Sequence, residues 1–177
     1  MPRIKSLPDV PRWAAVAAHA VPLLVLPSGL WRLALVSGLP VTLDAADGTM
    51  GLGEGVYVVS LSVVSELLAF LTLGLVRPWG EVFPRWTPFL GGRRVNPAAA
   101  AGTALAGAAG LCAIAAWGVY AAYAGLGPGI PVSPAQDAVL VACYAPLAAW
   151  PPLLAAVAVA YYRRRVGHQA PAVRLRA

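Results

Sequence analysis

The sequence predicts an all-α polytopic membrane protein, with four transmembrane helices in one bundle and both termini in the cytoplasm. Three observations lead to this prediction: the chain is 59% hydrophobic, only 11% of its residues are charged, and the charges gather between long apolar stretches. Soluble domains carry about 25% charged residues, so more than half of the expected charge is missing. A hydrocarbon core of roughly 30 Å needs about 20 helical residues per crossing. Four such stretches account for most of the 177 residues and leave no room for a separate soluble domain.

The chain begins with a short basic tail, residues 1–12, followed by an apolar run over about 13–39. This run is too long for the apolar region of a cleaved signal peptide, so we expect an uncleaved first helix. Pro22 and Pro27 lie inside it, and each removes a backbone donor, which predicts a kink. The loop that follows holds three acids and no basic residue.

The second helix is expected over about 55–76 and is the most uniformly apolar of the four. Ser62 and Glu66 stand one helical turn apart on the same face. A basic, aromatic segment follows over 77–96, with four arginines among tryptophans, phenylalanines and prolines. We expect this segment to lie in the headgroup region on the cytoplasmic side, with rings at the interface and arginines near lipid phosphates.

The third helix is expected over about 97–123, with Asn96 as its cap. It is rich in alanine, and small residues recur at every fourth position, at Gly102, Ala106 and Gly110. Such a stripe allows close approach of another backbone. The pattern predicts a packed central helix, and a surface for association with a second copy or with another membrane protein.

The fourth helix is expected over about 135–162, interrupted by three prolines and ending in two tyrosines and three arginines. A basic tail, residues 163–177, follows, and we expect it to be loose. The two tails and the 77–96 segment hold twelve of the thirteen Lys and Arg residues. Under the positive-inside rule these three regions face the cytoplasm of a bacterial cell, with the protein in its plasma membrane.

The net charge of +6 does not indicate nucleic-acid binding. The arginines lie at the ends of apolar stretches, where membrane topology uses them, and not in a basic groove with interleaved aromatic residues. We therefore expect the lipid bilayer as the surrounding partner and no nucleic acid.

Glu66 is the first candidate for a functional residue, because an ionisable group inside a membrane helix is costly and commonly functional. Arg32, near the outer third of the first helix, is expected to pair with it, since an unpaired arginine at that depth costs about 2.5–3.5 kcal/mol. Two interpretations stay open. The pair either locks the first two helices together, or forms a buried catalytic or binding site for a substrate or for protons.

Three further residues could line a pocket near Glu66: His19, Ser62 and Tyr144. His19 has no second metal-binding side chain at ligand spacing on its helix, so we expect no metal site. The chain also carries no phosphate-binding loop, nucleophile elbow or zinc-protease motif, and no cofactor is indicated.

The central segment carries the motifs WGE at Trp79–Glu81, PRW at Pro84–Trp86 and GGRRV at Gly91–Val95. With the PSGLWR end of the first helix and the serine- and glutamate-containing second helix, it resembles a family of small uncharacterised four-helix bacterial membrane proteins from high-GC genomes. The likeness spans nearly the whole chain. It implies the four-helix topology and no particular activity.

Three functions follow from these features. The first is a non-enzymatic membrane protein: a helix-bundle partner, an accessory subunit or a small transport component. The second is a membrane-embedded isomerase or cyclase acting on an isoprenoid or sterol-like lipid, with Glu66 as acid or base. The third is a proton- or ion-coupled carrier that uses the same glutamate.

Overall fold

The computed structural model describes residues 9–42, 50–82, 91–126 and 132–167. In this part of the chain 81% of the residues are helical and no strand is formed. Four helical units are long and apolar enough to cross a membrane: Arg12–Val36, Leu52–Leu75, Pro97–Tyr123 and Pro134–Gly167. The predicted all-helical class, with four helices that are long and apolar enough to span a membrane, is thus confirmed for the described residues.

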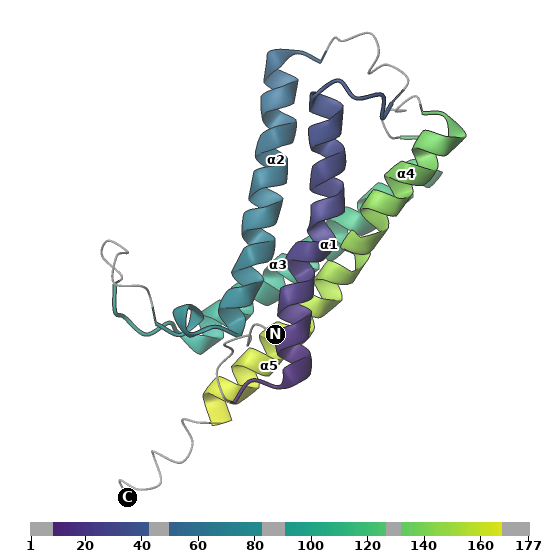
Figure 1. The fold of residues 1–177 in the computed structure, drawn as a ribbon. Coiled ribbons are helices and arrows are strands. Elements are labelled where there is room, and N and C mark those ends of the chain that lie inside the picture. The colour runs from purple at the N-terminus through teal and green to yellow at the C-terminus, as the bar shows by residue number, and fades with distance from the viewer. Residues whose placement is uncertain (1–8, 43–49, 83–90, 127–131, 168–177) are drawn as a thin grey trace, which may run out of the picture.

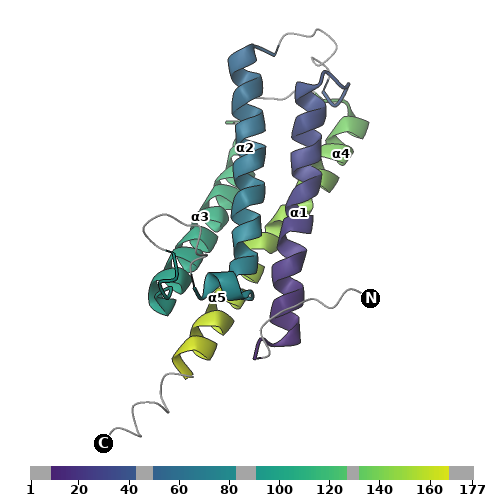
Figure 2. The same cartoon turned by 60° about the vertical axis from the view of Figure 1, so that its left-hand side comes forward.

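Helix α1 (Arg12–Val36) and helix α2 (Leu52–Leu71) stand side by side as a hairpin. Helix α3 (Pro97–Tyr123) and the unit formed by α4 (Pro134–Tyr144) and α5 (Trp150–Gly167) cross behind them at an angle, as Figures 1 and 2 show. The centre of the molecule is the contact between α1 and α5 (Trp150–Gly167), where Val21, Val25, Val157 and Ala158 are buried. Helix α2 packs chiefly against α1, and α3 packs chiefly against α5.

Two helix ends lie at positions that differ from the prediction, and a local feature of the chain explains each. Helix α1 runs unbroken through both of its prolines but ends at Val36, because Gly38 takes a left-handed conformation with φ of 77°. Helix α2 begins at Leu52, earlier than expected, because the Glu54 carboxylate accepts the Gly51 backbone N–H at 3.2 Å. Glu54 therefore belongs to the first turn of α2 and not to the preceding loop.

The fourth spanning unit is built from three pieces. Helix α4 (Pro134–Tyr144) is followed by a 3-10 turn, η4 (Ala145–Ala149), and then by α5. Pro146 lies in this turn, where a proline ring is tolerated and the helix axis can bend. Helix α5 continues to Gly167, so the first residues of the basic tail, expected to be loose, are helical.

A tight corner joins α2 to the basic segment. It consists of two 3-10 turns, η2 (Thr72–Leu75) and η3 (Pro78–Gly80), and an isolated bridge between Val82 and Arg94. The aromatic and proline residues of 83–90 lie outside the described residues, so the placement of this stretch among lipid headgroups stays a prediction.

Helix α3 is peripheral, and the prediction that it forms the packed centre is wrong. Only 11% of its most apolar window is buried, against 44% for α1. The face that meets α5 carries Ala101 and Ala108, whereas Gly102, Ala106 and Gly110 lie on the opposite, exposed face. Small side chains allow another helix to pack closely, but they do not determine which helix packs against them. Association through this stripe stays a prediction.

The helix ends alternate between the two ends of the molecule. Helix α1 begins, α2 ends, α3 begins and α5 ends at the lower end in Figure 1. Arg12, Arg77, Arg94 and the arginines of 163–165 belong to these helix ends or to the segments beside them. Within the described chain, the basic residues therefore gather at one end, with Arg32 as the exception.

Candidate functional site

A groove of about 420 Å³ lies between α1 and α2. Helix α1 lines it with Leu26, Gly29, Leu30 and Leu33, among others, and α2 lines it with Ser62, Val63, Glu66, Leu67 and Phe70. The leucines are half exposed, so the groove opens sideways, away from the α1–α5 centre. In a bilayer this opening would face hydrocarbon, because within the part of the chain that the structure describes α2 packs chiefly against α1.

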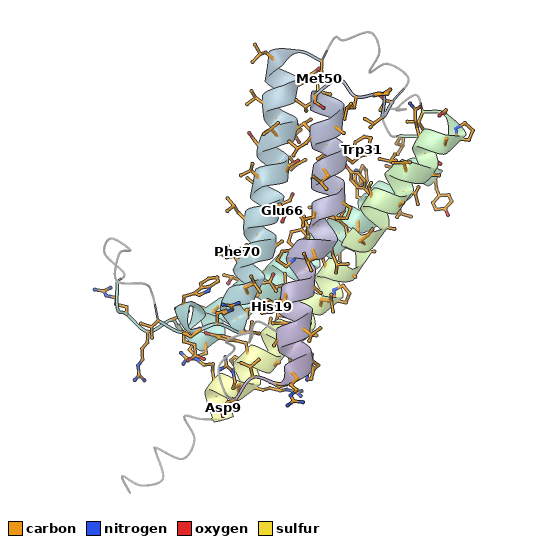
Figure 3. All side chains as sticks on the ribbon, viewed as in Figure 1. Asp9, His19, Trp31, Met50, Glu66 and Phe70 are labelled. Carbon is orange, nitrogen blue, oxygen red and sulfur yellow. The ribbon has the colours of Figure 1, made fainter. Side chains whose placement is uncertain are left out.

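Among the described residues that line this groove, Glu66 is the one with an ionisable side chain. Figure 3 shows it on α2, on the side that faces α1. Its carboxylate lies over Gly29, where an added Cβ would stand 3.8 Å from Oε1. Because glycine carries no side chain, α1 leaves room for the carboxylate at this level.

The Oε1 atom of Glu66 is buried and accepts no hydrogen bond. Within the described chain, salt bridges within 4.0 Å are formed by Glu81 and not by Glu66. A buried acceptor that leaves water without gaining a donor costs about 1–3 kcal/mol, and more when it is charged. The groove therefore holds an unsatisfied acceptor.

Ser62 is the second polar residue of the groove and is 6% exposed. Its hydroxyl donates to the Val58 carbonyl at 3.0 Å, one turn back along α2. The serine proton is thus used within the helix, and only the lone pairs of its oxygen remain. With Glu66 ionised, the polar side chains of the groove accept hydrogen bonds and have no proton left to donate.

Arg32 does not pair with Glu66, and the predicted ion pair is wrong. Its Nε donates to the Tyr144 hydroxyl at 3.1 Å, and the guanidinium carbon lies 5.3 Å from the centre of that ring. Arg32 is not among the residues that line the groove, and its side chain reaches the end of α4 instead. The sequence prediction paired Arg32 with Glu66 from their depths in a two-helix hairpin alone. It left out the fourth helical unit, which supplies Tyr144 as the partner of Arg32.

Tyr144 consequently lies away from the groove. Besides accepting from Arg32, its ring makes an edge contact with Trp31, with centroids 5.7 Å apart. These contacts join α1 to the end of α4. The structure gives Tyr144 a role in packing and does not bring it to Glu66.

His19 is also outside the groove and is bonded through both ring nitrogens. Its Nδ1 lies 2.7 Å from the Ala15 carbonyl, and Arg77 Nη2 lies 3.1 Å from Nε2. A guanidinium can only donate, so Nε2 accepts and the ring proton sits on Nδ1. His19 therefore connects α1 to the corner after α2. Of the sequence-predicted residues, Ser62 and Glu66 meet in one site.

Sequence reasoning missed an ionic cluster at the basic end of the molecule. Glu81 binds Arg164 at 2.9 Å and Arg165 at 3.3 Å, and Arg165 also donates to the Val95 carbonyl. Tyr161 adds a hydrogen bond to the Gly80 carbonyl. The signal was present as one acid in the basic segment and a run of arginines after the last helix. The cluster fastens the corner to α5.

The polar groups that the groove offers to a ligand, on Glu66 and Ser62, are hydrogen-bond acceptors. Among the described residues no group of three His, Cys, Asp or Glu could hold a metal ion. The chain matches no known family model, no curated protein and no solved structure, so no role is carried over from a relative and the resemblance noted from the central segment stays a prediction.

Proposed function

We propose that this chain is a non-enzymatic, multi-pass protein of the bacterial cell membrane that binds a membrane-borne ligand in the groove between α1 and α2. In this role it would serve as a small transport component or as an accessory subunit. The observation that carries the proposal is the side chain of Glu66, which lines an apolar, laterally open groove and whose buried Oε1 accepts no hydrogen bond.

The depth of Glu66 supports this function. Glu66 lies fourteen positions after Leu52, the first residue of α2. This corresponds to about 21 Å along a helix and places it well inside a hydrocarbon core of roughly 30 Å. An ionisable side chain at that depth costs about 2.5–3.5 kcal/mol unless something satisfies it. A ligand that supplies a donor offsets this cost, and the lateral opening gives it a route from the lipid.

The groove lining supports binding over catalysis. An isomerase or cyclase acting on an isoprenoid or sterol-like lipid must move protons, and an acid normally works with a second group that takes or returns one. Ser62 has committed its proton to the backbone, while His19 and Tyr144 are bonded elsewhere. Glu66 thus lacks an acid–base partner among the described residues that line the groove. A coupled carrier would share the binding step and add transfer of the ligand across the membrane.

We also propose that the arginine-rich end faces the cytoplasm. The starts of α1 and α3 and the ends of α2 and α5 lie at that end, and cytoplasmic segments of membrane proteins carry an excess of Lys and Arg. Both chain termini would then be cytoplasmic.

Native mass spectrometry tests the groove-binding function. The protein is extracted from its membrane in copolymer nanodiscs, and the small molecules that stay bound are measured. We expect a stoichiometric adduct on the wild-type protein and on Leu23→Trp, whose site is an exposed position of α1 outside the groove. Leu30→Trp fills the groove and should lose the adduct. The same adducts in all three proteins would contradict the proposal.

A further inference from the structure

We infer that the ligand of this groove is a lipophilic primary amine, with its ammonium group at Glu66 and its apolar chain between α1 and α2. The inference rests on the groove-binding function proposed above and adds the chemical class of the ligand. It follows from the charges, the hydrogen-bonding groups and the size of the groove.

The charge argument starts from the cations near the groove. Neither Arg32 nor Arg77 is bonded to Glu66. Arg32 donates through Nε to the neutral Tyr144 hydroxyl and keeps a buried Nη1 without a partner among the described residues. Arg77 donates through Nη2 to His19. The chain supplies two arginines to Glu81, yet no basic side chain of the described residues lies within 4.0 Å of Glu66. A carboxylate at this depth therefore lacks a counter-ion from its own chain, and a cationic ligand would provide it.

The hydrogen-bonding groups favour an amine over an alcohol. The groove offers the carboxylate of Glu66 and the lone pairs of Ser62, all acceptors. A primary ammonium carries three donors and no acceptor, so each of its polar hydrogens can find a partner. A hydroxyl would bring an acceptor of its own into a groove that has no free donor, which leaves that acceptor unsatisfied.

The dimensions favour a small molecule over a partner helix. A volume of about 420 Å³ falls within the range of small-molecule sites, roughly 300–1,000 Å³. The walls are almost entirely aliphatic, and Phe70 closes one end of the α2 side, stacked on Trp79 at a centroid distance of 6.0 Å. An alkyl chain matches this lining, and the side opening lets it enter from the bilayer.

Three probes with the same chain length test the ligand class on the wild-type protein in phosphatidylcholine nanodiscs. Radiolabelled dodecylamine has charge and donors, dodecyltrimethylammonium has charge without donors, and dodecanol has a donor without charge. We expect saturable binding of dodecylamine, and binding weaker by about 10- to 100-fold for the other two, as for loss of hydrogen bonds to a charged group. Equal or tighter binding of dodecanol would overturn the inference that the ligand is an amine, but it would not contradict the groove-binding function.

Substitutions then locate the site. Glu66→Gln should weaken dodecylamine about 10- to 100-fold, while Glu54→Gln, on the same helix but outside the groove, should leave it unchanged. Ser62→Ala and Ser65→Ala form a second matched pair, because both hydroxyls bond one turn back on α2 and only Ser62 lines the groove. Circular dichroism and gel filtration check that each variant is folded.

The outcomes separate the two claims. Unchanged dodecylamine binding in folded Glu66→Gln, or no saturable dodecylamine binding to the wild type, overturns the inference that the ligand is an amine. Unchanged binding of every probe in Leu30→Trp means that the groove is not the site, and it removes the groove-binding function as well.

Discussion

Glu66 and Glu81 are the same side chain in two surroundings, and the surroundings give them different roles. Glu81 lies at the basic end and is held by two arginines that are 11% and 18% exposed. Glu66 lies within a spanning helix and keeps a buried oxygen without a partner. At Glu81 the charge is used to fasten elements together, whereas the groove-binding proposal assigns the Glu66 carboxylate to a ligand.

Replacing Glu81 with glutamine tests the fastening role. The change keeps the shape of the side chain but leaves Arg164 and Arg165 without their anion, in a partly buried position. We expect the free energy of unfolding to fall by about 1–3 kcal/mol. Thermal unfolding in detergent, followed by circular dichroism, measures it. Asp137→Asn, at an exposed acid of α4, is the control and should stay within about 0.5 kcal/mol. Equal stability of the two variants would contradict the role given to Glu81.

Replacing Tyr144 with phenylalanine tests the contact between α1 and the end of α4. The ring and its contact with Trp31 remain, but Arg32 loses its hydroxyl acceptor. A loss of about 1–2 kcal/mol in unfolding free energy is expected. Tyr123→Phe, at a side chain that is 90% exposed, should change little in the same assay. If Arg32 instead paired with Glu66 in the membrane, Tyr144→Phe would be as neutral as its control.

At the scale of elements, the corner between α2 and α3 depends on two glycines that face each other. A Cβ at Gly74 would stand 2.7 Å from the ring of Trp79, and a Cβ at Gly80 would overlap the Gly74 carbonyl. The two 3-10 turns can approach this closely because neither position carries a side chain. This approach places Glu81 beside α5.

The matched substitutions Gly80→Ala and Gly102→Ala should therefore have opposite signs. Gly80→Ala forces the backbone of the corner apart and should cost at least about 2 kcal/mol. Gly102 lies in α3 with open space around it, and alanine there should stabilise the helix by about 0.5–1 kcal/mol. The midpoint of thermal unfolding should fall for the first variant and rise for the second. A fall of similar size in both would show that the outer face of α3 is packed against something.

The existence and order of these elements could be predicted from the sequence, because runs of apolar residues of spanning length determine them. The exact ends could not, since they depend on local contacts such as the Glu54 side chain at Gly51 and the left-handed Gly38. The amino-acid composition of a helix also failed to predict where that helix lies in the bundle. Helix α3 is rich in small residues, which predicted a central place, yet it packs against α5 along one face only.

At the scale of the whole molecule, the groove exists because α2 lies at the edge. Helices α1 and α5 form the centre. Among the described elements, α2 packs chiefly against α1 and has no second large neighbour. One side of the α1–α2 contact is then open to the surroundings. A bundle with α2 in its middle would have enclosed Glu66.

Sequence reasoning could find Ser62 and Glu66 as a site, because both lie on one face of one helix. It could not choose the partners of Arg32 and His19, because these come from the α4–η4 bend and from Arg77, which are distant in the chain. Depth along a helix can be read from the sequence, but rotation about the helix axis toward a particular neighbour requires the packed structure.

The orientation of the molecule is tested by cysteine labelling in intact cells, after Cys112 and Cys143 are replaced with alanine. Met50→Cys lies before α2 and Arg94→Cys lies before α3, at opposite ends of the molecule. With the arginine-rich end in the cytoplasm, a membrane-impermeant maleimide should label the first variant and reach the second after lysis only. Labelling of Arg94→Cys in intact cells would show that the arginine-rich end faces outward and would contradict the proposed orientation.

The most direct measurement is the reaction of Glu66 with dicyclohexylcarbodiimide, an apolar reagent that reaches carboxyl groups from the lipid phase. Peptide mass spectrometry of the protein, treated in its native membrane, locates the adduct. An open groove predicts modification of Glu66, protection by added dodecylamine, and no adduct on the ion-paired Glu81. If Glu66 stayed unmodified while a water-soluble carbodiimide labelled Glu54, the carboxylate would be closed to the membrane and the groove-binding account would be wrong.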